Sequence, residues 1–274
     1  GHNLFLDEGV YLFTDTLIVP AGVTILGTGK RRSILWADLP SDGYGLQLGT
    51  LLTYPFGSHI TLKDFAILGG TSCGLAALYW HHLWRANIDI YINGDWDYMG
   101  LDEYLSAAGE EAAYPGIMTS HIQIEHSHND PYFWFSPTYP PSPKRGFYTN
   151  SWINANKIWI EISKTTVGDG LHFIGMSGGM TSNIQGVIQS CAGKAIVIEG
   201  GSYPAWGLSI SNMHCESNVG GDISITNANN IYIGDNVGGN IILSSCHNIH
   251  LQSFIGKLTL DEDCFDISID GAPN

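Results

Sequence analysis

Two glutamates occupy matching positions in two short hydrophobic segments of this chain. The segments are His121-Ile122-Gln123-Ile124-Glu125 and Lys157-Ile158-Trp159-Ile160-Glu161. If their isoleucines point inward on neighbouring strands, both glutamates face outward, one strand apart. Carboxyl groups about 5 Å apart suit a retaining glycosidase, and their repulsion raises the pKa of one of them, which separates the acid from the nucleophile. We therefore predict Glu125 and Glu161 as catalytic residues.

Nearby outward positions add a third carboxylate and several aromatic rings. In the segment Asn87-Ile88-Asp89-Ile90-Tyr91, Asp89 occupies the position of Gln123 and Tyr91 the position of Glu125, so both are expected to face outward. Asp89 is predicted to assist catalysis. Aromatic rings can stack on the apolar faces of sugars, and an amide can hydrogen-bond to their hydroxyl groups. The predicted substrate-binding residues are Tyr91, Gln123, Trp159 and, from neighbouring loops, Trp96 and Trp134.

These segments are copies of a phrase that recurs along the chain. A polar residue precedes two inward aliphatic residues with one residue between them, as in Asn230-Ile231-Tyr232-Ile233 and Asn248-Ile249-His250-Leu251. A second phrase with the same period of two lies between the copies. Ile231, Ile249 and Ile267 are 18 residues apart, which leaves no room for a helical crossover. Each turn must stack directly on the last, about 4.8 Å along the axis. The sequence therefore predicts an all-β, right-handed parallel β-helix, a solenoid of short strands.

The repeat also predicts the domain organisation. Residues 1–274 are expected to form one β-helix domain that lacks its N-terminal cap. Longer spacings place two loop insertions at about 94–115 and 129–146, the first with a helix-like stretch over 101–113. Both insertions come from neighbouring turns and are expected to overhang one region of the surface.

Composition excludes several classes of partner. The net charge is −15, from 26 acidic residues against 11 Lys and Arg, so neither nucleic acid nor an anionic membrane surface is an expected partner. No apolar run approaches the roughly 18–20 residues of a membrane span. The five cysteines form no CxxC pair and are predicted to be buried thiols in the solenoid.

Other polar residues are interpreted structurally. Asp169, in Gly168-Asp169-Gly170, is predicted to be a turn residue, and His172 and His214 lie on later coils with no assigned partner. The Asn and His residues that precede the isoleucines are expected to form ladders of side-chain hydrogen bonds at the coil corners. No metal site is predicted, because the histidines lack carboxylates at a ligand spacing.

The first coils resemble the pectate-lyase-like β-helix superfamily, which includes polysaccharide-degrading enzymes and phage tailspike proteins. The resemblance covers residues 6–35, with the stretches Leu6-Asp7-Glu8-Gly9-Val10-Tyr11, Gly27-Thr28-Gly29 and Ser33-Ile34-Leu35. It implies the β-helix architecture and, through the tailspikes, a homotrimer. The three-aspartate cluster of the polygalacturonases is absent, and the calcium carboxylates and proton-accepting base of the pectate lyases are not evident.

We expect from this an extracellular or virion-associated protein that binds a polysaccharide in a lateral groove and cleaves it as a glycoside hydrolase does, without a cofactor. One alternative is a non-catalytic structural or adhesive β-helix of a phage tail fibre, tailspike or extracellular filament. A second alternative is a polysaccharide lyase that depends on calcium, because clustered carboxylates can also hold a cation.

Overall fold

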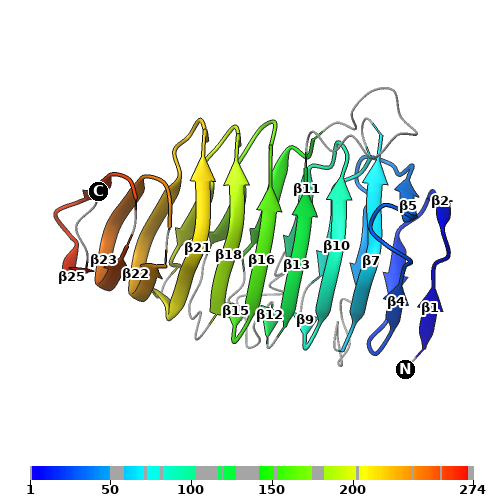
Figure 1. Ribbon diagram of the computed structural model, residues 1–274, viewed down its shortest axis with the longest axis horizontal. Coiled ribbons are helices and arrows are strands. Elements are labelled where there is room, and N and C mark those ends of the chain that lie inside the picture. The colour runs from blue at the N-terminus through cyan, green and yellow to red at the C-terminus, as the bar shows by residue number, and fades with distance from the viewer. Residues whose placement is uncertain are drawn as a thin grey trace.

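Strands of consecutive coils stack into one elongated solenoid, seen from the side in Figure 1. The computed structural model describes residues 2–49, 59–70, 73–80, 83–102, 117–118, 120–127, 142–150, 153–174, 182–201, 204–235, 237–253 and 255–270. Within these ranges the strand ladders are parallel and no helix occurs. The chain is a right-handed parallel β-helix, as the repeat predicted.

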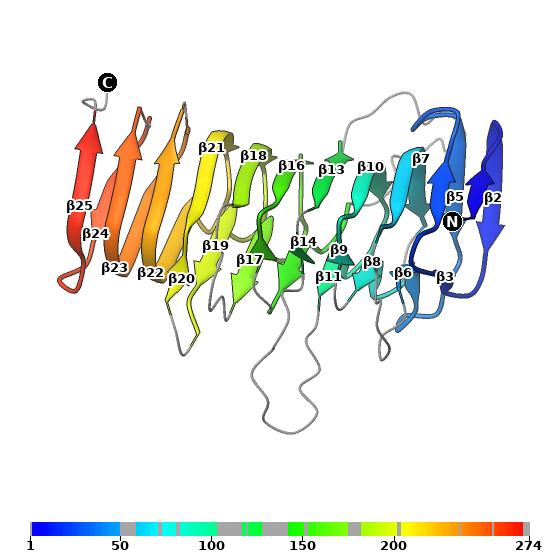
Figure 2. The same cartoon turned by 90° about the horizontal axis from the view of Figure 1, so that it is seen from below.

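Two faces of the solenoid carry the side chains of interest. The front face, toward the viewer in Figure 1, contains β1 (Asn3–Phe5), β4 (Thr24–Leu26), β7 (Thr61–Gly69), β10 (Asn87–Asn93), β13 (His121–His126), β16 (Lys157–Ile162), β18 (Ser182–Gln189), β21 (Leu208–Glu216) and β25 (Phe265–Asp270). The lower face, seen from below in Figure 2, contains β3 (Leu17–Val19), β6 (Tyr44–Leu48), β8 (Ala76–Trp80), β11 (Tyr98–Asp102), β14 (Arg145–Thr149), β17 (Leu171–Ile174), β19 (Ile196–Glu199) and β24 (Leu258–Leu260).

The remaining strands connect or extend these faces. Two long strands, β22 (Ile223–Gly234) and β23 (Ile241–Gln252), begin on the lower face and end on the front face. Near the N-terminus, β2 (Gly9–Phe13) pairs with β5 (Ser33–Ala37), which pairs in turn with the second half of β7. A short ladder joins β9 (Leu83–Trp84), β12 (Ile117–Met118) and β15 (Ile153–Asn154), and β20 (Ala205–Trp206) pairs with the middle of β22.

The isoleucines that the repeat predicted to point inward fill the interior. Ile88, Ile122 and Ile158 pair in register across β10, β13 and β16, and none is more than 4% exposed. Burying one such side chain contributes about 1.5–3 kcal/mol, so the stacked columns supply most of the driving force for the fold. The cysteines are free thiols as predicted: Cys73, Cys191, Cys215 and Cys246 are buried and Cys264 is partly buried.

Polar residues at the corners of the coils have two functions. Asn230, Asn248 and Asp266 adopt φ values of 60°, 51° and 54°, a left-handed conformation that Asn and Asp tolerate better than most residues. Asn248 Nδ2 also donates a 2.9 Å hydrogen bond to Asn230 Oδ1 on the preceding coil. The predicted ladder is therefore present here, and the bend itself explains why asparagine precedes the isoleucine.

Two β-bulges shift the alignment that a strict period of two predicts. Before the first bulge, Leu62 pairs with Ile88 and Lys63 pairs with Asp89. The extra residue at Asp64, with φ 60°, then places Ala66 rather than Phe65 opposite Tyr91. Aligning the recurring segments by Ile60 and Ile88 would place Lys63 opposite Tyr91, and this alignment is wrong because Leu62 pairs with Ile88. A second bulge shifts β18 against β21 after Ile184, so Gly186 pairs with Met213 rather than with Asn212.

Part of each predicted insertion belongs to a strand. Residues 98–102 form β11, which pairs with β8 and β14, so the helix-like stretch does not begin at Leu101. Arg145 and Gly146 likewise open β14. Residues 103–116 and 128–141 lie outside the described part of the chain. Across the described residues, no helix is long and apolar enough to cross a membrane.

Candidate functional site

Glu125 and Glu161 lie side by side on the front face. They are directly paired residues of β13 and β16, and the pairs Gln123–Trp159 and Ile124–Ile160 precede them in the same ladder. The predicted register is therefore correct. Both glutamates and Trp159 are partly exposed.

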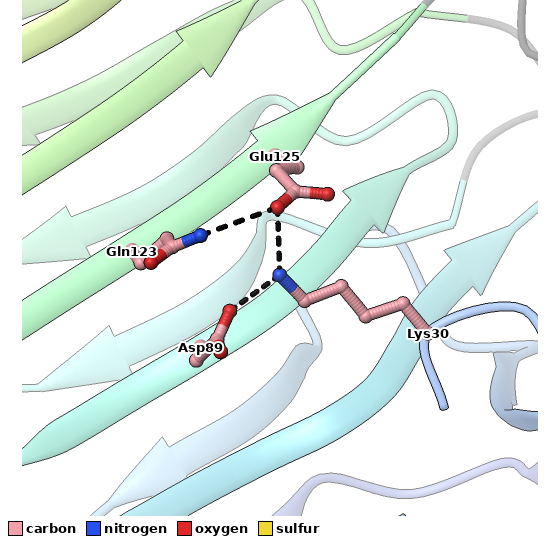
Figure 3. A network of polar contacts seen from close by, with 4 residues as sticks. All are labelled: Lys30, Asp89, Gln123 and Glu125. Atoms are coloured by element: carbon pink, nitrogen blue, oxygen red, sulfur yellow. Dashed lines mark hydrogen bonds and ion pairs between the residues drawn. The ribbon is translucent and has the colours of Figure 1, made fainter. Parts of the chain in front are cut away.

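A lysine from a distant part of the sequence occupies this region. Lys30 lies in the corner between β4 and β5, and its Nζ atom contacts Asp89 Oδ1 and lies 2.8 Å from Glu125 Oε1, as Figure 3 shows. Gln123 Nε2 donates to the same Glu125 oxygen at 3.4 Å. The side chains of Lys30, Asp89 and Glu125 are 18%, 25% and 33% exposed, so the cluster is only partly hydrated.

Lys30 changes the chemistry expected of the carboxylates. Burial opposes protonation of this lysine, but hydrogen bonds to Asp89 and Glu125 outweigh burial and raise its pKa above the ordinary value. An ammonium group donates hydrogen bonds and accepts none, so the carboxyl oxygens that it contacts act as acceptors. Lys30 therefore offsets part of the negative charge that Asp89 and Glu125 bring to this face.

Two aromatic residues predicted to bind sugar are covered. Trp96 is fully buried in the core, where its indole nitrogen donates to Asn93 O at 3.2 Å, so its assignment to a groove wall is wrong. Tyr91 is 4% exposed and donates its hydroxyl hydrogen to Ser127 O at 2.9 Å. It packs outside the main core with Ile34, so it offers no open ring face. Trp134 lies outside the described residues.

The lower face carries a different polar site. A cavity of about 200 Å³ is lined by Tyr98, Arg145, Phe147, Tyr148, Gly168, Asp169 and His172. The side chains come from β11, β14, β17 and the turn before β17. These elements belong to three successive coils, and their strands pair directly, β11 with β14 and β14 with β17. The parallel ladder therefore fixes the spacing across the cavity.

His172 is held in one orientation inside this cavity. Its Nδ1 lies 3.1 Å from Asp169 Oδ2, which places an Nδ1–H group where it donates to the carboxylate. Nε2 is covered and has no hydrogen-bond partner within the described part of the chain, and Glu199 Oε1 lies 3.8 Å away. An imidazole oriented by a carboxylate is an arrangement that general-base catalysis uses.

Asp169 has a second anchor. Its Oδ1 accepts a 2.6 Å hydrogen bond from the backbone N–H of Lys194 on the next coil. Burial raises the pKa of this carboxyl, but the hydrogen bonds from His172 and Lys194 outweigh burial and hold the pKa below its ordinary value. Asp169 is therefore an ionised group that fixes the imidazole, which is more than the turn role predicted from the sequence.

Aromatic and cationic groups complete the cavity. The Tyr148 ring meets the His172 ring edge-on at 5.7 Å, and Tyr98 and Tyr148 have ring centroids 5.8 Å apart. The Arg145 guanidinium lies 5.2 Å above the Tyr98 ring, a cation–π distance. The cavity thus combines a base, a cation and two phenol groups.

These residues differ in how far the sequence could have indicated them. Lys30 and Glu125 are 95 residues apart, and no local pattern links them. The pair Asp169 and His172 carried a usable signal, since a Gly-Asp-Gly turn immediately precedes a strand whose outward residue is histidine. Among the described residues, no three His, Cys, Asp or Glu side chains are arranged to hold a metal ion.

Comparisons with known proteins are sparse. No protein-family model and no curated protein matches the chain. The mannuronan C-5 epimerase AlgE4 A-module of Azotobacter vinelandii is similar, with 12% identity and a TM-score of 0.48, over 97% of this chain and 67% of that one. Tailspike protein 2 of Escherichia coli O157:H7 bacteriophage CAB120 is similar with 12% identity and a TM-score of 0.35, over 96% of this chain and 39% of that one. Function must be argued from the site, because one fold hosts many activities.

Proposed function

We propose that this β-helix binds a polysaccharide across the cavity on its lower face and cleaves it by a proton-transfer reaction at His172. The observation that carries the proposal is the imidazole itself: Asp169 orients it, and its Nε2 has no hydrogen-bond partner among the residues that the structure describes. Tyr98 and Tyr148 offer ring surfaces for sugars beside it. An extended surface along stacked coils also suits a linear polymer.

Arg145 favours a sugar that carries a carboxylate. A guanidinium binds a carboxylate through paired hydrogen bonds and draws electron density from the adjacent carbon. Without such a cation, the net charge of −15 would repel an acidic polymer. Arg145 offsets this repulsion at the cavity, so the proposed substrate is an acidic polysaccharide.

The proposed reaction is a β-elimination. His172 Nε2 takes the proton from the carbon beside the carboxylate, and the resulting electron pair forms a carbon–carbon double bond. This step requires Nε2, which is covered in the structure, to become accessible when the substrate binds. The glycosidic C–O bond breaks, and a phenol hydroxyl of Tyr98 or Tyr148 donates a proton to the leaving oxygen. Asp169 stabilises the imidazolium that forms and is a positioning residue.

The test is product analysis on a panel of acidic and neutral polysaccharides. We compare the parent with His172→Gln and with a matched control, His214→Gln. His214 also lies beside a carboxylate, with Nε2 3.1 Å from Glu216 Oε2, but it is 57% exposed and does not line the cavity. Elimination creates a conjugated double bond that absorbs ultraviolet light, and hydrolysis does not.

Each outcome has a defined meaning. Ultraviolet-absorbing products from the parent and His214→Gln, with at least a roughly hundredfold loss in His172→Gln, support the proposal. Equal activity of all three proteins contradicts it. Binding without any product would favour the adhesive or structural alternative.

Hydrolysis on the front face is a second candidate, favoured by the direct pairing of Glu125 with Glu161. In this case Glu125 is the nucleophile or base beside Lys30 and Glu161 is the acid. Asp89, Gln123 and Trp159 would contact the sugar or support the carboxylates. New reducing ends without ultraviolet absorbance, lost in Glu125→Gln with Glu161→Gln, identify this route. Either activity fits an extracellular or virion-associated setting, where polysaccharides are found.

A further inference from the structure

The corner that carries Lys30 is fixed on the coil next to it. Backbone N–H groups of Gly27 and Gly29 donate to Lys63 O and Asp64 O, both at 2.8 Å. A Cβ atom on Gly27 would lie 2.1 Å from Asp64 O, so only glycine permits this approach. The corner thus packs against the bulge at Asp64, and this contact fixes the position of the Lys30 backbone.

Lys30 then reaches past β7 to two further coils. It contacts Asp89 on β10 and Glu125 on β13, so one side chain links the corner after β4 to strands of two other coils (Figure 3). Ladder hydrogen bonds join only neighbouring strands. This contact therefore links segments that the ladder joins only indirectly, through β7.

The segment held in this way, residues 2–49, has few contacts on its outer side within the described residues. There, β1, β2 and β3 each pair with a strand on one side only, namely β4, β5 and β6. Leu4, Phe5 and Leu12 are 51%, 68% and 66% exposed. Opening of residues 2–49 must break the pairing of β4 and β5 with β7 and also the contacts of Lys30, so the two linkages act together.

We propose that Lys30 with Asp89 and Glu125 forms a charge clasp, and that the clasp couples residues 2–49 to β10 and β13. Opening of this segment is then controlled by charge. High ionic strength or loss of the ammonium group makes the N-terminal coils open more often while the remaining coils stay folded. The device is independent of the cavity at His172.

Hydrogen exchange measured by mass spectrometry tests the clasp. We compare the parent with Lys30→Met, which keeps the apolar stem without the charge, and with Lys30→Arg, which keeps the charge and should behave like the parent. At low salt, amides of β4 to β6 should exchange about tenfold faster in Lys30→Met than in the parent. Amides of β22 and β23 should exchange equally in all three proteins. At about 1 M salt, where the Debye length is about 3 Å, the parent should approach Lys30→Met.

Three results would refute the clasp. The first is equal exchange rates of the β4 to β6 amides in the parent and Lys30→Met at low salt. The second is an increase in exchange rate that is as large in β22 and β23, and the third is a rate difference between the two proteins that does not decrease at high salt. If Lys30→Met does not fold, the salt dependence of the parent decides the matter. A local rise in exchange at β4 to β6 with added salt supports the clasp, and its absence refutes it.

Discussion

Replacing Asp169 by asparagine probes the proposed site at its most specific contact. The substituted side chain would keep an oxygen for the backbone N–H of Lys194, which now lies 2.6 Å from Asp169 Oδ1. It would lose the charge that faces His172 Nδ1 at 3.1 Å. Where its amide NH2 faces the ring, Nδ1 must become the acceptor, and the proton moves to Nε2, the atom proposed as the base.

The expected loss of activity is large and the loss of stability is small. An imidazole in the wrong tautomer cannot take the substrate proton, so kcat/KM should fall by about 10²–10⁴-fold. A hydrogen bond to a charged group contributes about 1.5–3 kcal/mol, and one of the two is retained, so the free energy of unfolding should fall by about 1–2 kcal/mol.

The pH dependence of stability has a defined sign. The folded-state pKa of Asp169 lies below its ordinary value of 3.8. A group with a lowered pKa contributes stability above its unfolded pKa and loses it as the pH falls through the folded pKa. The stability difference between the parent and Asp169→Asn should therefore be constant near neutral pH and shrink as the pH falls below about 4.

The assay combines elimination kinetics with urea unfolding from neutral to acidic pH. Asp222→Asn is the matched control, because Asp222 Oδ2 accepts a 2.8 Å bond from the Asn240 backbone N–H and Asp222 is not a cavity residue. Its stability should fall and its kcat/KM should not. If Asp169→Asn keeps kcat/KM within about twofold of the parent, or both variants lose it equally, the positioning role assigned to Asp169 is refuted.

Three further predictions concern the solenoid. Gly186→Ala should lower the free energy of unfolding by about 3 kcal/mol or more, because φ is +133° and the new Cβ would lie 1.9 Å from Ile160 O; a loss under about 1 kcal/mol in urea unfolding would contradict this packing. Ile124→Ala should cost about 2–5 kcal/mol in the same assay and Ile242→Ala, at an exposed position, less than about 1 kcal/mol; equal losses would place Ile124 outside the core. Cys264, the partly buried thiol, should react with iodoacetamide before the four buried thiols in the native protein, as peptide mapping can check; simultaneous labelling would mean that the solenoid opens as a whole.

The architecture could be predicted from the sequence because a parallel solenoid repeats one local rule. Each coil needs inward aliphatic residues two positions apart, and Ile122, Ile158 and Ile249 mark the interior in three different coils. The direct pairing of Glu125 with Glu161 follows from the same rule. This part of the site was predictable because a parallel ladder converts matching sequence positions into neighbours in space.

The rule failed where a strand departs from the period of two. The bulge at Asp64 places Ala66 rather than Phe65 opposite Tyr91, and no residue type in the segment predicts it. Trp96 was misassigned because a tryptophan in a loop-like segment can also turn inward, and here it fills the core. Alternation alone cannot distinguish these cases, since it assumes a regular strand.

The polar contacts were the least predictable feature. Lys30 contacts its partners because the corner of its coil packs closely against the next coil, and this packing depends on the absence of a Cβ atom at Gly27. Asp169 and His172 are near in sequence, but their contact depends on the conformation of the turn between them. Such contacts are set by corners, whose conformation varies more than that of the strands.

A crystal structure of His172→Gln with an acidic oligosaccharide bound would test the proposed site without relying on turnover. We predict sugar rings against Tyr98 and Tyr148 on the lower face, with a substrate carboxylate within hydrogen-bond distance of Arg145. Sugar bound beside Glu125 and Glu161 on the front face, or no sugar at the lower face at saturating concentration, would contradict the assignment of the lower cavity as the binding site.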